Sequence, residues 1–95
     1  MPPIHPGEIL KEELEELSIS ARSLAGKLGV PTNRITGILN QKRSITPDTA
    51  LHLARYFGTS PEFWMNLQQA HDLKMVKQTK GVEIETVVEP LKVNG

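Results

Sequence analysis

A run of polar and basic side chains occupies residues 30–43, which read VPTNRITGILNQKR. Arg can read guanine through two hydrogen bonds, Asn can read adenine in the same way, and Thr offers a hydroxyl and a methyl group. These residue types at close spacing therefore predict contacts with the base edges of double-stranded DNA. The candidate base-reading residues are Thr32, Asn33, Arg34 and Thr36.

The charge distribution supports a polyanionic partner, although the 95-residue chain has a formal net charge of zero. Residues 18–46 contain five Lys and Arg and no acid, whereas the first 17 residues contain five Glu and one Lys. DNA responds to the local field and not to the average charge. The candidate phosphate-binding residues are Arg22, Lys27, Asn40, Lys42 and Arg43. A plain solubility role for single cations such as Arg22 and Lys27 is the alternative.

Two short helices are needed to position these side chains. Ser20 is a suitable N-cap for a helix that Gly29 ends. A second helix then starts near Pro31 and turns Ile35 and Ile38 inward, which leaves the polar side chains on its outer face. Two short helices joined by a glycine turn form a helix-turn-helix unit, whose second helix enters the DNA major groove.

The remaining apolar pattern predicts an all-α domain of five helices over about residues 5–77. Start signals recur at Pro6, Pro47 and Pro61, because proline suits the first turn of a helix. In the last helix we expect Phe63 to face the core and Trp64 to lie at its edge. We therefore assign residues 1–77 to a helix-turn-helix DNA-binding domain.

Residues 78–95 form a tail with a different period. Val82, Ile84, Thr86 and Val88 alternate with other residues, and a period of two predicts a short strand. One strand is not stable alone. Two interpretations stay open: the segment pairs with a strand of another chain, or it remains an extended, loose tail.

Several classes of protein lack support in the sequence. There is no cysteine, and the three His residues are too scattered to indicate a metal site. No catalytic constellation is recognisable, so we expect no enzyme activity and no cofactor. The first residues do not resemble a signal peptide, and no apolar run approaches the length of a membrane span. We expect a soluble, cytoplasmic protein with no membrane partner.

Three segments carry a resemblance to a known family: HPGEIL, LSISARSLAGKLGVPTNRITGILNQKRSIT and TALHLARYFGTSPEFWMNLQ. Over roughly residues 3–73 they resemble the HigA-type antitoxins of the Xre/Cro-like helix-turn-helix superfamily. The resemblance implies a five-helix Cro/repressor-like fold and a homodimer that represses its own operon at an inverted-repeat operator. It also implies neutralisation of a HigB-type ribonuclease toxin. By position, Thr32, Asn33, Arg34 and Thr36 match the family's base-reading helix, and Lys42 and Arg43 match its phosphate-binding loop.

Two positions depart from expectation. The superfamily usually has Gln after the N-cap of the first helix of the pair, where it contacts the DNA backbone, and this chain has Ala21. Arg22 could supply that contact, or the contact could be absent. Gly37 falls within the reading helix, where it either permits close approach of DNA or reflects drift. The alternative function is a protein-interaction module whose helix-turn-helix no longer reads DNA.

Overall fold

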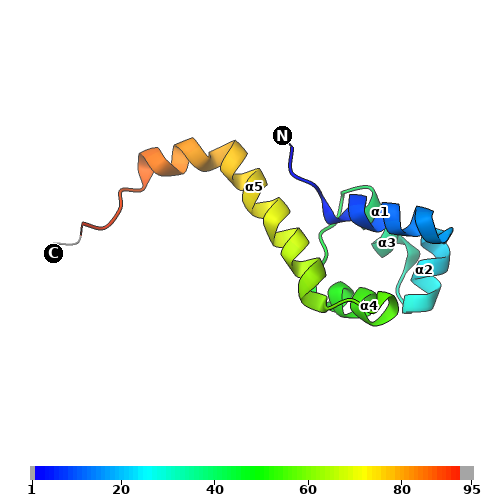
Figure 1. Ribbon diagram of the computed structural model, residues 1–95. Helices are drawn as coiled ribbons and strands as arrows, with labels where there is room; N and C mark the ends of the chain where they lie inside the picture. Colours follow the sequence, from blue (N-terminus) through cyan, green and yellow to red (C-terminus); the bar gives the residue numbers. More distant parts are fainter. Residues whose placement is uncertain (1, 93–95) are drawn as a thin grey trace.

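The computed structural model describes residues 2–92, and this part of the chain contains five α-helices and no strand. The helices are α1 (Pro6–Leu17), α2 (Ala21–Leu28), α3 (Thr32–Leu39), α4 (Pro47–Phe57) and α5 (Pro61–Val87). The predicted all-α fold is confirmed. Figure 1 shows α1 to α4 grouped on one side of the first half of α5, while the second half of α5 leads away from them.

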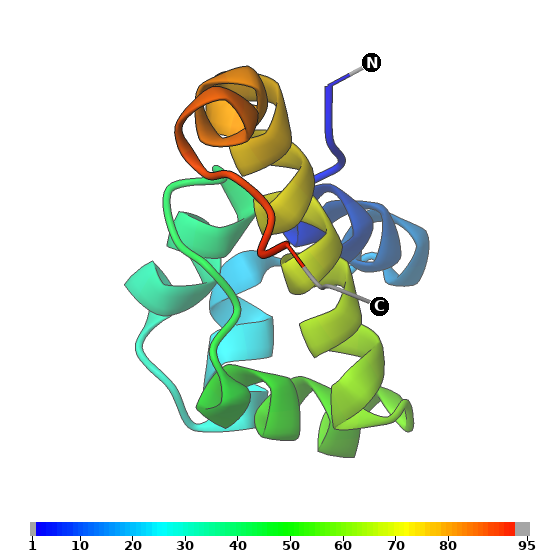
Figure 2. The same cartoon turned by 90° about the vertical axis from the view of Figure 1, so that its left-hand side faces the viewer.

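One hydrophobic core joins the five helices. Every helix contributes at least one fully or almost fully buried apolar side chain, and the largest are Leu10, Leu24, Ile35, Ile38, Leu53 and Trp64. In Figure 2, α3 lies along one edge of the body beside the loop that leads to α4. The core therefore holds α3 by its inner side and leaves its outer side free.

Side chains cap the start of four helices. His5, Ser20, Thr46 and Ser60 each accept a hydrogen bond from a backbone N–H two or three residues later. At His5 the acceptor is Nδ1, so the cap requires a ring without a proton on that atom. Burial lowers the pKa of His5, and the nearby His71 ring lowers it further, which favours the neutral form that the cap needs.

The N-terminus of α1 packs directly against the C-terminal turn of α3. Gly7 is buried, and a Cβ at this position would collide with the carbonyl group of Ile38. Only glycine allows the two backbones to come this close. Nearby, Nε2 of Gln41 donates a hydrogen bond to Oε1 of Glu8 at 3.4 Å. The approach of Gly7 to the Ile38 carbonyl sets the distance between α1 and α3.

The prediction for the start of α5 is wrong about which aromatic residue is buried. Trp64 is 2% exposed and its Nε1 donates to Oγ1 of Thr59 at 2.9 Å, whereas Phe63 is 43% exposed. The buried face of α5 continues one turn later with Gln68, which is polar. A pattern based on apolar residues alone therefore pointed to the wrong face of the helix.

The predicted strand at residues 82–88 is also wrong. α5 continues without interruption to Val87, and Val88 is its extended C-cap. Extending an existing helix gains one hydrogen bond for each residue that is fixed, whereas an isolated strand gains none. The hydroxyl of Thr86 donates back to the carbonyl of Val82 at 2.8 Å, within the helix. α5 thus runs through the expected domain boundary at residue 77, and the division itself stays a prediction.

α5 is long, but charged residues interrupt its apolar ones throughout. Within residues 2–92, no helix combines the length and the apolar character that crossing a bilayer requires.

Two glycine substitutions test the packing of α1 on α3. Gly7→Ala should lower the free energy of unfolding by about 1–3 kcal/mol, because the new methyl group meets the Ile38 carbonyl. Gly26→Ala is the matched control, because Gly26 lies in α2 with open space around it. This substitution should raise the free energy of unfolding by up to about 1 kcal/mol. Urea unfolding followed by circular dichroism measures both, and equal effects would contradict the close approach.

Candidate nucleic-acid interface

The outer face of α3 carries the four candidate base-reading residues. Thr32 and Asn33 are exposed, and Arg34 and Thr36 are half-buried, while Ile35 and Ile38 on the inner face are completely buried. The turn before α3 is compact: Gly29 has a φ of 72°, and the N–H of Val30 returns to the carbonyl of Ala25 at 3.0 Å. The structure therefore presents all four side chains on the surface of one short helix.

The loop after α3 is held by backbone hydrogen bonds. The N–H groups of Asn40, Gln41 and Lys42 donate to carbonyls in the last turn of α3, at 2.8–3.0 Å. Gln41 takes a positive φ of 60°, which bends the chain away from the helix. Lys42 and Arg43 are exposed, and this backbone arrangement holds them next to the C-terminus of α3.

The far end of this loop is tied to α5 by a buried side chain. Oε1 of Gln68 accepts a hydrogen bond from the N–H of Ile45 at 2.7 Å, and its Nε2 donates to Asp72 at 2.9 Å. His71 also bonds to Asp72, and this bond is the main reason that the pKa of Asp72 is lowered. Gln68 is 4% exposed, so the loop depends on a polar contact within the core.

Arg43 explains the glycine at position 37. A Cβ on Gly37 would lie 3.3 Å from Cβ and Cδ of Arg43, so the stem of Arg43 lies over this position. Neither interpretation from the sequence had included this contact. The absence of a side chain at residue 37 lets Arg43 lie close against α3.

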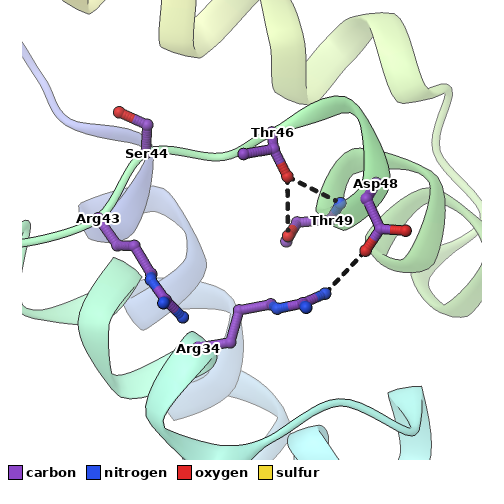
Figure 3. A pocket seen from close by; sticks show the side chains of 6 residues that line it. All are labelled: Arg34, Arg43, Ser44, Thr46, Asp48 and Thr49. Carbon is purple, nitrogen blue, oxygen red and sulfur yellow. Dashed lines mark hydrogen bonds and ion pairs between the residues drawn. The ribbon is translucent and has the colours of Figure 1, made fainter.

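Arg34 and Arg43 line one hollow between α3 and the start of α4. Its volume is about 380 Å³, and its other lining residues are Ser44, Thr46, Asp48 and Thr49. Figure 3 shows Arg34 reaching across to Asp48, with the side chain of Arg43 beside it. Nη1 of Arg34 donates to Oδ2 of Asp48 at 2.7 Å. Asp48 lies in the first turn of α4.

Arg22 and Lys27 lie at the two ends of α2, in its first and last turns, and both are exposed. Ala21 is half-buried beside Arg22. The structure thus groups seven of the nine candidate residues on α3 and its following loop, and places these two on the preceding helix. Asp48 and Gln68 are the residues that sequence patterns missed, because their partners are 14 and 23 positions away.

Comparisons with known proteins agree with this geometry. The helix-turn-helix family model matches residues 10–64, which is more than half of the chain. Virulence-associated protein I of Dichelobacter nodosus is 53% identical over 81 residues, covering 84% of this chain and 75% of that protein.

Two solved structures are similar over nearly their whole length. One is an addiction module antidote protein of a HigA family from Coxiella burnetii, with 60% identity, a TM-score of 0.93, and coverage of 96% of this chain and 100% of that one. The other is the Pseudomonas aeruginosa antitoxin HigA with the higBA promoter, with 45% identity, a TM-score of 0.92, and coverage of 95% and 99%. The chain therefore belongs to the Xre/Cro-like helix-turn-helix family and, within it, to the HigA-type antitoxins.

Proposed function

We propose that this protein is a sequence-specific DNA-binding repressor and the antitoxin of a toxin–antitoxin pair. The observation that carries the proposal is the outer face of α3, which presents Thr32, Asn33, Arg34 and Thr36 beside the cations of the next loop. A helix of this kind fits the major groove of B-DNA. The similar Pseudomonas antitoxin has been solved with the higBA promoter, which supports DNA binding by this chain.

In this proposal the side chains divide into two roles. The four residues of α3 read base edges, while Arg22, Lys27, Asn40, Lys42 and Arg43 contact phosphates. Phosphate contacts supply affinity that depends strongly on salt, whereas base contacts supply sequence preference. The two roles therefore differ in a measurable way.

Substitution of single cations separates these roles. Arg34→Ala should weaken binding to the selected operator duplex by about 1–3 kcal/mol and relax the preference at one base pair. Lys42→Ala or Arg43→Ala should weaken binding to all duplexes alike and lower the salt slope by about one unit. Fluorescence anisotropy across a salt series measures both. Equal losses on operator and random DNA for Arg34→Ala would show that Arg34 only contacts phosphate.

The protein is proposed to bind DNA as a homodimer at an inverted repeat. One recognition helix reads only a few base pairs, too few to select a site in a genome. A twofold pair reads two half-sites about 34–36 Å apart, or a multiple of that distance. The second half of α5 offers a surface for the second copy, since Leu73, Val76, Ile84 and Val87 are exposed there. At 100° per residue they lie along one side of the helix.

A pair of acidic substitutions on α5 tests this dimer surface. Ile84→Asp should shift the protein toward the monomer at micromolar concentration, because a charge would enter the apolar contact. Val82→Asp is the matched control, since Val82 is exposed but lies on the opposite side of the same helix. Sedimentation velocity reads out the mass. A wild-type monomer, or equal dissociation by both variants, would contradict the proposed surface.

We further propose that a HigB-type ribonuclease toxin is the second partner, which the similarity to HigA proteins supports. The expected genetic sign is a small basic reading frame next to this gene. Expressing that frame alone should arrest growth, and co-expression with this chain should restore it. An Arg34→Ala chain should still restore growth, because the proposal assigns Arg34 to DNA reading and not to toxin binding. Arrest that persists with the wild-type chain would contradict the antitoxin role.

A further inference from the structure

The guanidinium group of Arg34 forms an ion pair with the carboxylate of Asp48. Nη1 of Arg34 lies 2.7 Å from Oδ2 of Asp48, and the two side chains are 32% and 64% exposed. An ion pair this open to water contributes little to folding stability. The ion pair does restrict the position of the guanidinium group, because an Arg side chain without a partner samples many rotamers.

The contact leaves Arg34 able to bind something else. A guanidinium group has five N–H donors, and the hydrogen bond to Asp48 is made by Nη1 and uses one of them. Guanine requires two further donors in a fixed plane. Asp48 is in turn flanked by His52, whose Nδ1 lies 3.6 Å from Oδ2 and 2.7 Å from the carbonyl oxygen of Asp48.

The neighbouring Arg43 adds a second positive charge close to the carboxylate of Asp48. Both arginines line the same hollow, and Asp48 is the acid among the six residues around it (Figure 3). Two guanidinium groups in one hollow repel each other unless an anion lies nearby. The carboxylate draws Arg34 toward the start of α4, while the stem of Arg43 stays over Gly37.

We propose that Asp48 is a specificity-determining residue of DNA recognition that acts by positioning Arg34. It orients the guanidinium group before DNA arrives, so that the remaining donors meet a guanine in the correct plane. Asp48 itself contacts no base. This inference rests on the proposed reading of DNA by α3 and adds to it a residue from α4.

A simpler electrostatic role for Asp48 predicts a different result. An acid near the DNA surface repels phosphates, so its removal would strengthen binding to every duplex by the same factor. A positioning role instead alters the preference at a single base pair. The two roles are distinguished by comparing ratios of affinities, since a uniform gain cancels in the ratio.

The test uses the full-length chain and a duplex that it selects from a randomised pool, together with all single-base-pair variants of that duplex. Dissociation constants are measured at one salt concentration for wild type, Asp48→Ala, Asp48→Glu, Arg34→Ala and the Arg34→Ala/Asp48→Ala double variant. Thermal unfolding of each variant verifies that it is folded. The Arg34→Ala background is the matched control, because Asp48 has no guanidinium group to position there.

Asp48→Ala should reduce the preference at the base pair read by Arg34 on the order of fivefold, while binding to random DNA is unchanged or tighter. Asp48→Glu, which keeps the charge, should recover part of that preference. In the Arg34→Ala background the Asp48→Ala change should leave every preference unaltered. The inference is overturned if Asp48→Ala shifts all duplexes equally while Arg34→Ala still removes a base preference. If Arg34→Ala alters no preference at all, base reading by Arg34 itself fails.

Discussion

The approach of α1 to the last turn of α3 is the constraint on which the rest of the structure depends. Residue 7 can be nothing larger than glycine, because its Cα faces the carbonyl group of Ile38. Ile35 and Ile38 are completely buried on the inner face of α3, so α3 can neither rotate nor move outward without exposing them. The polar side of α3 is then the side that remains for a partner.

The same constraint extends to the loop that follows α3. The loop starts from three hydrogen bonds to the last turn of the helix and ends on the amide of Gln68. The backbone that carries its cations therefore has a defined position relative to the reading helix. The stem of Arg43 also lies over Gly37, where there is no side chain to displace it. A chain with no net charge can have a basic surface here, since all of its acidic residues lie outside residues 18–46.

Local signals made much of the fold predictable from the sequence. Ser20 caps α2 and Gly29 ends it with a φ of 72°, as expected, and Pro6, Pro47 and Pro61 each stand in the first turn of a helix. These features depend on neighbouring residues only, so a single sequence contains them. The helix-turn-helix unit and the exposure of the candidate DNA-binding residues follow from the same local patterns.

Contacts between distant residues could not be predicted in this way. Nothing in the sequence links Arg34 with Asp48, or Gln68 with Ile45, because folding alone brings them together. The segment 82–88 misled for a related reason. Its β-branched residues favour a strand in isolation, but the helix that precedes it supplies a template for further helical hydrogen bonds.

The central claim is that the outer face of α3 and the loop after it form the DNA-binding surface. The most direct measurement is an NMR titration of the isotope-labelled full-length chain with the selected operator duplex, following each backbone amide. The account predicts that the largest shifts occur at residues 32–36 and 40–44, with smaller ones at the ends of α2. Shifts confined to the acidic side of α1 or to the second half of α5, with α3 unchanged, would contradict it.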